Sequence, residues 1–218
     1  MQVFYEGQGR FKLFYDHSYS IISSDELYRI LKRWFYMLPD NVLKFIVYKF
    51  RSGWIKENQI YVDFEYKDIH QFRILFYTSW DFIELVDYGF NVNARIPISC
   101  LKKEDIYTTF FEFYRLVREK PFYYWVDDIG KDPNTCVWDI TYLAFGGSIK
   151  VKAKIPGEYI MEYRSNKGEV ITRNGYASEP DILFKMMDTF YNEIVNRPKY
   201  TRPTGRPLRW NPITKRFE

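Results

Sequence analysis

Three segments of the chain place an apolar residue at every third or fourth position, a spacing that predicts amphipathic helices. They cover residues 25–38, 103–119 and 179–196. Each contains a Phe-Tyr pair and is followed by a proline, which is typical of a helix end. The pairs are Phe35-Tyr36, Phe113-Tyr114 and Phe190-Tyr191, and the prolines are Pro39, Pro121 and Pro198.

Between these segments apolar and polar residues alternate, which is typical of strands with one buried face. The predicted strands cover residues 42–50, 59–67, 71–78, 81–88, 92–99, 122–127, 137–145, 148–155, 158–164 and 169–174. Turn sequences such as Gly146-Gly147 and Asn174-Gly175 separate them. We therefore expect an α+β fold, with an antiparallel sheet or sheets covered by helices on one face.

The predicted elements recur with an almost constant offset. Successive Phe-Tyr pairs are 78 and 77 residues apart, and residues 62–64 align with residues 138–140 at an offset of 76. This periodicity predicts two pseudo-repeats, near residues 40–120 and 121–197, each with about five strands and one helix. Two unrelated halves with the same order of elements are the alternative. Residues 1–197 are expected to form a single domain.

Basic residues and prolines are concentrated at the C-terminus. Residues 198–218 contain six Lys or Arg residues, one acid and four of the ten prolines. They carry +5, and because the whole chain carries +4, residues 1–197 carry about −1. This basic, Pro-rich segment has no helical or alternating pattern, so we expect it to be an extended tail.

The composition is globular, with 46% hydrophobic and 28% charged residues, and it excludes a disordered chain. Aromatic residues make up 21% of the 218 residues, with 20 Tyr and 19 Phe. So many Tyr and Phe residues are typical of AT-rich coding sequences. This bias suggests an origin in a virus or a mobile element.

Cysteine and hydropathy patterns indicate the compartment. Cys100 and Cys136 are the two cysteines of the chain, and we expect both to be reduced thiols. The first residues do not resemble an export signal, and no apolar run is long enough to cross a membrane. We therefore expect a cytoplasmic protein, in the host cell if it is viral, with no membrane partner.

Known catalytic motifs are not evident in the chain. His17 and His70 are the two histidines, and neither has a second ligand at the spacing of a metal site. No Gly-rich phosphate loop and no Gly-x-Ser-x-Gly elbow is found. We expect no metal and no cofactor.

One predicted strand carries a regular row of cations. Lys150, Lys152 and Lys154 share one face of it, at roughly the spacing of successive phosphates. Tyr159 and Tyr163 on the next predicted strand are candidates to stack on bases. A solvated strand face, with lysines that protect a sheet edge, is the alternative interpretation.

The tail is the second candidate for binding a polyanion. Arginine pairs with phosphate through two hydrogen bonds, and an extended arm loses little entropy when it lies along a polyanion. The candidate residues are Arg202, Arg206, Arg209, Trp210, Lys215 and Arg216. A strap that docks Leu208, Trp210 and Ile213 on the body or on another subunit is the alternative.

One pattern resembles an enzyme family. Pro39-Asp40 followed by Glu65-Tyr66-Lys67 resembles the P-D…(D/E)-x-K signature of the restriction-endonuclease-like nucleases. The resemblance implies that Asp40 and Glu65 hold Mg²⁺ and that Lys67 orients the attacking water, with Glu26 as a further acidic residue. A solvent-facing Glu and Lys on a strand are the alternative.

These features favour a non-enzymatic nucleic-acid-binding protein of a virus or mobile element, with an aromatic-rich sheet and a basic C-terminal arm. Single-stranded nucleic acid is one of the ligand forms considered, because exposed aromatic residues can stack on bases; DNA or RNA and single or double strands are left open. The first alternative is a protein-interaction or virion-associated protein, in which exposed aromatic residues form a subunit interface of a homo-oligomer. The second alternative is a Mg²⁺-dependent nuclease.

Overall fold

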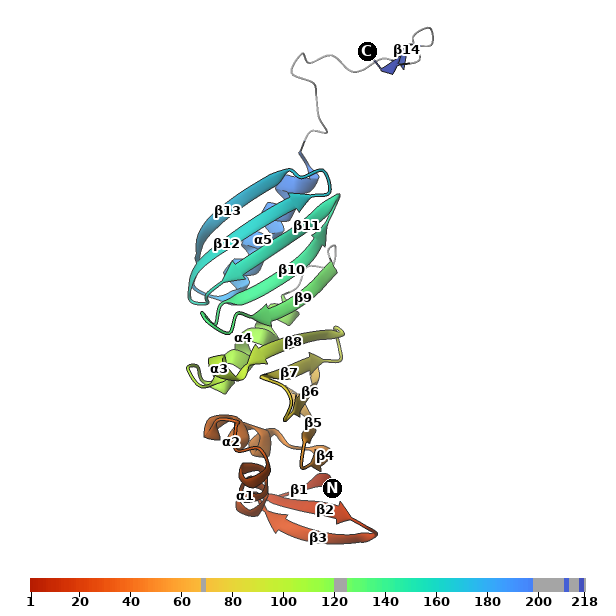
Figure 1. Ribbon diagram of the computed structural model, residues 1–218, viewed down its shortest axis with the longest axis vertical. Helices are drawn as coiled ribbons and strands as arrows, with labels where there is room; N and C mark the ends of the chain where they lie inside the picture. The colour runs from red at the N-terminus through yellow and green to blue at the C-terminus, as the bar shows by residue number, and fades with distance from the viewer. Residues whose placement is uncertain (68–69, 120–124, 198–209, 212–215, 218) are drawn as a thin grey trace.

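The structure is a computed structural model that describes residues 1–67, 70–119, 125–197, 210–211 and 216–217. Five helices and one sheet of 13 strands make up most of the described part. Figure 1 shows the strands stacked along the long axis of the molecule, with β3 at one end and β13 at the other. The expected α+β class with a large antiparallel sheet is confirmed.

The N-terminal part forms one end of the sheet and two helices. Its elements are β1 (Gln2–Gly7), β2 (Arg10–Tyr15), β3 (Ser18–Ser23), α1 (Ser24–Trp34) and α2 (Asp40–Lys49). Helix α1 begins at a capping box, in which the Ser23 side chain accepts from the Glu26 N–H and the Glu26 carboxylate accepts from the Ser23 N–H. This cap fixes the point at which the chain leaves the edge strand.

Two successive runs of five strands follow, and each run is followed by a helix. The first consists of β4 (Ser52–Lys56), β5 (Gln59–Tyr66), β6 (His70–Tyr77), β7 (Phe82–Asp87) and β8 (Val92–Pro97), with α3 (Ile98–Leu101) and α4 (Ile106–Arg118). The second consists of β9 (Trp125–Lys131), β10 (Trp138–Ala144), β11 (Gly147–Ala153), β12 (Gly157–Ser165) and β13 (Val170–Ala177), with α5 (Pro180–Val195). Apart from the short helix α3, which has no counterpart in the second run, the same order of elements occurs twice, and a common origin of the two runs stays a prediction.

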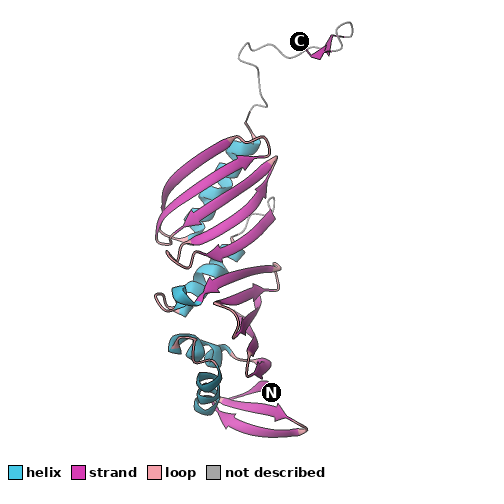
Figure 2. Cartoon of the chain, viewed as in Figure 1, coloured by secondary structure: helices cyan, strands magenta, loops and turns pink. Residues whose placement is uncertain are grey.

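The helices pack on one face of the sheet, as Figure 2 shows, and the opposite face is open. Burial alternates along the strands in agreement with this arrangement, for example in β7 and β11. The core between sheet and helices is rich in aromatic rings. Phe72 on β6 is fully buried and contacts the rings of Phe64, Phe110 and Phe113. Such rings bury large apolar areas and stabilise the sheet–helix interface.

The predicted strand at residues 42–50 is wrong, because these residues belong to helix α2. Its β-branched and aromatic residues favour a strand, but its buried positions recur at helical spacing: Val42, Leu43, Phe45, Ile46 and Val47. Helix α1 ends at Trp34, and Pro39 directly precedes helix α2. Pro39 therefore does not directly mark the end of α1. Strands β1 to β4 were not among the predicted strands, and residues 122–124 lie outside the described residues.

The two runs of strands meet at a weak joint. β8 and β9 are parallel, whereas all other neighbouring strands of the sheet are antiparallel. The β8–β9 register consists of one residue pair, Arg95 with Gly130, while β10 and β11 share a ladder of seven pairs. Side chains near this joint must therefore contribute to holding the two parts of the sheet together.

Candidate interaction surface and buried lysine cluster

An aromatic patch lies on the open face at the N-terminal end of the sheet. It consists of Phe4 on β1, Phe14 on β2, and Tyr19 and Ile21 on β3, which are 36%, 38%, 61% and 53% exposed. The rings of Phe4 and Phe14 are 5.7 Å apart, and those of Phe14 and Tyr19 are 6.0 Å apart. The Lys12 ammonium lies 4.2 Å from the Tyr19 ring centroid. We call these five residues the N-terminal patch.

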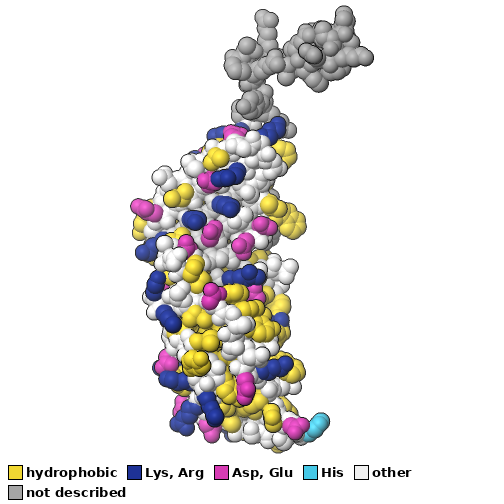
Figure 3. Space-filling model, in the orientation of Figure 1, with side chains coloured by type: hydrophobic (Ala, Val, Ile, Leu, Met, Phe, Trp, Pro, Cys, Tyr) yellow, Lys and Arg dark blue, Asp and Glu magenta, His cyan; other side chains and the backbone are white. Residues whose placement is uncertain are grey.

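Figure 3 shows hydrophobic side chains gathered over the half of the molecule that holds the N-terminal strands. Basic and acidic side chains are interspersed over both halves. Contiguous exposed apolar side chains mark interaction sites more often than scattered ones do. The N-terminal patch is therefore a candidate interaction surface.

Strand β3 borders this patch and forms one edge of the sheet. It contains no charged residue and no proline over Ser18–Ser23. Native edge strands usually carry such residues, because they prevent pairing with another chain. The opposite edge, β13, has Arg173 in mid-strand, which pairs with Glu193 of α5 at 2.6 Å. Strand β13 thus carries a charged residue that disfavours pairing with another chain, whereas β3 carries none.

The hairpin turn sets which backbone groups of β3 are free to pair. Asp16 and His17 form a two-residue turn with φ of 44° and 64°. Hydrogen-bonded and non-hydrogen-bonded pairs alternate from such a turn. Tyr19 and Ile21 consequently fall in non-hydrogen-bonded pairs with β2, and their N–H and C=O groups point to the outer edge.

A second exposed group surrounds Arg73 on β6. Its guanidinium lies 3.7 Å from the Tyr61 ring centroid and 4.7 Å from that of Tyr88. It also pairs with the Asp63 carboxylate at 2.8 Å. Burial raises the pKa of Asp63 and of Tyr88. Because Asp63 neutralises Arg73, this group is poorly suited to bind a phosphate.

The lysine row lies on the open face of β11, as expected, and all three side chains are exposed. Carboxylates lie among them, however. Lys150 is paired across the sheet with Glu162, and the Lys152 ammonium is 4.0 Å from Asp139. Lys152 and Lys154 line a shallow hollow of about 650 Å³ that also contains Glu158. The row is therefore part of a mixed-charge face.

Tyr159 and Tyr163 do not share the face of the lysine row, which corrects the prediction that they stack on bases beside it. They are 5% and 6% exposed and lie on the helix-covered face. In the β11–β12 register they stand opposite Ala153 and Ile149, which are buried. Opposite residues in a ladder point to the same face, so the register directs both tyrosines into the core. The Tyr163 hydroxyl donates to the Phe145 carbonyl at 3.1 Å.

Asp40, Glu65 and Lys67, the residues of the nuclease-like pattern, lie in surroundings that differ from those of a metal site. Asp40 starts α2 and pairs with Lys32 at 3.2 Å, which lowers the pKa of the Asp40 carboxyl. Glu65 is exposed near the end of β5, and Lys67 follows in a turn with φ of 55°. Strand β6, not a helix, comes next. Within the described ranges, no group of three or more His, Cys, Asp or Glu residues is placed to hold a metal ion.

Most candidate residues of the tail lie outside the described residues. These are Arg202, Arg206, Arg209 and Lys215. Trp210 and Arg216 belong to two short antiparallel strands, β14 (Trp210–Asn211) and β15 (Arg216–Phe217). This local pairing concerns four residues of the tail, and its extended form stays a prediction.

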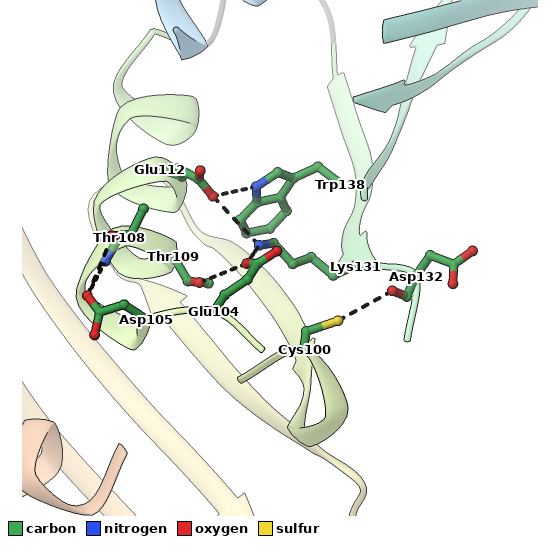
Figure 4. A network of polar contacts seen from close by, with 9 residues as sticks. All are labelled: Cys100, Glu104, Asp105, Thr108, Thr109, Glu112, Lys131, Asp132 and Trp138. Atoms are coloured by element: carbon green, nitrogen blue, oxygen red, sulfur yellow. Dashed lines mark hydrogen bonds and ion pairs between the residues drawn. The ribbon is translucent and has the colours of Figure 1, made fainter. Parts of the chain in front are cut away.

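A buried cation lies at the joint between the two runs of strands (Figure 4). Lys131, the last residue of β9, has a side chain that is 1% exposed, and it pairs with Glu104 and with Glu112 of α4, the latter at 3.6 Å. Trp138 of β10 donates its indole N–H to Glu112 at 3.0 Å, and the Lys131 ammonium lies 4.7 Å from the Trp138 ring centroid. We call these four residues the lysine cluster.

The lysine cluster borders a hollow of about 230 Å³ that Cys136 also lines. Burial raises the pKa of Glu112, and the charge of Lys131 opposes that shift. The carboxylates compensate the buried ammonium, which is a condition for burying a charge. The arrangement therefore positions α4 against β9 and β10.

Neither the N-terminal patch nor the lysine cluster was predicted from the sequence. Alternating residues on both sides of Gly7 and Gly9 are a signal that could have revealed the first hairpin and its exposed face. Lys131 follows Ile129 by two positions on β9, which places it on the buried face. Its carboxylate partners come from a different segment, and no local pattern identifies them.

Comparison with protein-family models, with curated proteins and with solved structures finds no match for this chain. In the described part of the chain, none of the helices has the length and apolar character needed to span a membrane.

Replacement of Lys131 tests the lysine cluster. We expect Lys131→Met to lower the free energy of unfolding by about 3–5 kcal/mol, because Glu112 then remains buried without its cation. Urea denaturation followed by circular dichroism measures this change. The matched control is Lys150→Met, which alters an exposed lysine and should change stability by about 0.5 kcal/mol at most.

The double variant Lys131→Met, Glu112→Gln should be more stable than Lys131→Met alone, because no charge is left unpaired at Glu112. Equal stability of the Lys131→Met variant and the wild type would contradict the role of this cluster.

Proposed function

We propose that the protein is an interaction protein that assembles through the N-terminal end of its sheet, where β3 pairs with β3 of a second copy. The observation that carries this proposal is the uncharged edge strand beside the exposed N-terminal patch. Aromatic side chains and exposed strand edges are both enriched where proteins join. This is the class of function in which exposed aromatic residues form a subunit interface.

The strand is compatible with pairing to itself about a two-fold axis. The backbone N–H and C=O groups of Tyr19 and Ile21 point to the outer edge of β3. An antiparallel register centred on Ser20 therefore sets Tyr19 of each copy opposite Ile21 of the other copy. Pairs of an aromatic and a β-branched residue are among the favourable cross-strand pairs. The patches of both copies then form one continuous surface.

Charge complementarity supports the same register. β3 itself carries no charge, so no like charges meet along the strand. The turn residue Asp16 comes to lie beside residue 24 of the second copy, which begins α1. The first turn of that helix already carries Asp25 and Glu26, so the cation that favours this position of Asp16 is Arg10 of the second copy, on the neighbouring strand.

Charging the edge tests the assembly. We expect the wild type to form a dimer and the Ile21→Lys variant to be monomeric. The variant places a lysine on each of the two paired β3 strands, and lysines on edge strands prevent pairing with another chain. Sedimentation equilibrium over a series of concentrations measures the mass. Val170→Lys is the matched control, since Val170 is 49% exposed on the other edge strand and should leave the dimer intact. A wild type that stays monomeric at every concentration would exclude this function.

A cross-link tests the register. Ser20→Cys should form a disulfide between two copies, because residues facing each other in a non-hydrogen-bonded pair have Cα atoms at a distance that suits a disulfide. Ser18→Cys serves as the control, since residue 18 faces residue 22 of the second copy. Non-reducing electrophoresis detects the product. A dimer in which Ser20→Cys does not cross-link would contradict the register centred on Ser20.

We also propose that the basic tail binds nucleic acid, with single strands preferred. The observation in favour is the charge of +5 in residues 198–218, beside about −1 on the rest of the chain. Its arginines suit phosphate, and Trp210 suits a base. The lysine row contributes less, because Asp139 and Glu162 lie beside it.

Deletion of residues 198–218 should therefore weaken binding to a single-stranded oligonucleotide and flatten its salt dependence. Loss of three phosphate contacts lowers the slope of log K against log[salt] by about two. Fluorescence anisotropy at several salt concentrations measures both. The comparison is a variant with Lys150, Lys152 and Lys154 changed to Gln, for which we expect a smaller effect. No binding by the intact chain at about 50 mM salt would remove this candidate.

We propose further that the two runs of five strands and a helix are repeats of one ancestral unit. The constant offset of 76 to 78 residues supports this proposal. Superposition of residues 52–118 on residues 125–195 should align β5 with β10 and bring residues 62–64 onto residues 138–140. Alignment of residues 62–64 with another strand would contradict it.

A further inference from the structure

Two buried cysteines lie on opposite sides of the weak β8–β9 joint. Cys100 belongs to α3, which directly follows β8, and Cys136 belongs to the turn between β9 and β10. Both are free thiols, 0% and 7% exposed. The Cys100 thiol donates to the Asp132 carbonyl at 3.4 Å, and the Cys136 N–H donates to the same oxygen at 2.8 Å. Because both donors lie on one oxygen atom, the Cys100 sulfur lies close to the backbone of Cys136.

Other contacts hold the same two segments together. The Ser99 hydroxyl donates to the Pro133 carbonyl at 3.0 Å, and the Lys103 ammonium donates to the Asn134 carbonyl at 3.1 Å. These bonds fix the segment after β8 on the turn before β10, where the backbone ladder itself has one residue pair. The thiols are therefore held in proximity by the fold and do not depend on chance encounters of mobile segments.

We propose that Cys100 and Cys136 form a reversible disulfide in response to a peroxide, and that this bond locks the joint between the two parts of the sheet. The proposal is independent of the assembly and nucleic-acid functions above. It assigns a modification site to residues that those functions do not use.

Cys136 is the thiol that meets the oxidant, because it lines the hollow of about 230 Å³ beside the lysine cluster. Its sulfur attacks one oxygen of hydrogen peroxide and the O–O bond breaks, which yields a sulfenic acid and one water. The Cys100 sulfur then attacks the sulfenic sulfur, and the hydroxyl group leaves with the thiol proton as a second water. Two thiols are oxidised by two electrons in total, and one peroxide is reduced.

The surroundings make the first step selective and slow. Burial, together with the neighbouring Cys136, raises the pKa of Cys100 to about 12, so this thiol is protonated at neutral pH and does not start the reaction. Lys131 lies close enough to oppose that shift. The order of attack, Cys136 first and Cys100 second, follows from their exposure, because Cys136 lines the hollow and Cys100 is fully buried.

The bond would close the segment of chain that contains α4 and would tether α3 to the turn before β10. Cross-linking restricts the unfolded chain and so raises stability when the native geometry accommodates the bond. Here it would add a covalent connection at the joint where the ladder is shortest. The expected consequence is a stiffer connection between β8 and β9.

The experiment treats the full chain, at low protein concentration, with hydrogen peroxide. Mass spectrometry of the intact protein should show the loss of two hydrogens, and digestion without reductant should give one linked peptide pair that contains Cys100 and Cys136. Dithiothreitol should restore the original mass. In urea, the oxidised wild type should unfold at a higher midpoint than the reduced form, and hydrogen exchange at β8 and β9 should slow.

Cys100→Ser and Cys136→Ser are the matched controls, and neither should lose two hydrogens or change its urea midpoint on oxidation. Dimedone should label Cys136 in the Cys100→Ser protein, because its sulfenic acid has no second thiol to attack. The wild-type mass and peptide measurements stand alone if either variant fails to fold. Oxidation of the wild type to sulfinic acid without a linked peptide, a link between two copies, or no reaction before the chain unfolds would overturn the proposal.

Discussion

The contact between the buried Lys131 ammonium and the two carboxylates, Glu104 and Glu112, is the buried charged contact that connects the two runs of strands at their weak joint. Elsewhere the backbone ladders hold neighbouring strands together, but β8 and β9 share one residue pair. Glu112 lies on α4, which follows the first run of strands, while Lys131 lies in the second run. A buried ion pair of this kind specifies how its elements fit more than it adds to stability, because removing the ions from water costs free energy. The lysine cluster therefore sets the orientation of one run against the other.

Covering one face of a long sheet with helices leaves the other face and both edges to solvent, and these are the surfaces on which we propose that partners bind. Over β10 to β12 the open face carries both basic and acidic side chains. This mixture keeps the face hydrated and gives it only a weak attraction for a polyanion. At the N-terminal end the same face carries Phe4, Phe14 and Tyr19 beside an edge without charges. This difference between the two ends is the reason why we propose assembly at one of them. The body is therefore better suited to protein than to nucleic acid.

Periodicity predicted most strands and all three long helices, because alternation and helical spacing are local properties of a buried face. It failed at residues 42–50, where a helix is buried on several sides and its composition is typical of a strand. The stacking role of Tyr159 and Tyr163 failed for another reason: residues on neighbouring strands share a face only in the right register, and the register was not known. The lysine cluster joins positions up to 27 residues apart, and the pair Cys100 and Cys136 bridges two elements. Such contacts follow from the tertiary fold, and the sequence pattern alone does not identify them.

In the proposed dimer, the two basic tails would be able to bind one polyanion at the same time. A dimer joined at β3 would carry two copies of the basic tail, each following α5 beside the far edge of its own sheet. Binding of the first tail to a polyanion raises the effective concentration of the second, as long as the strand of nucleic acid is long enough to reach both. Because the bodies carry about −1 each, we expect them to contribute little to holding the polyanion, so that the distance between the tails would decide the gain. Short and long ligands would then differ in affinity for the dimer but not for a monomer such as Ile21→Lys.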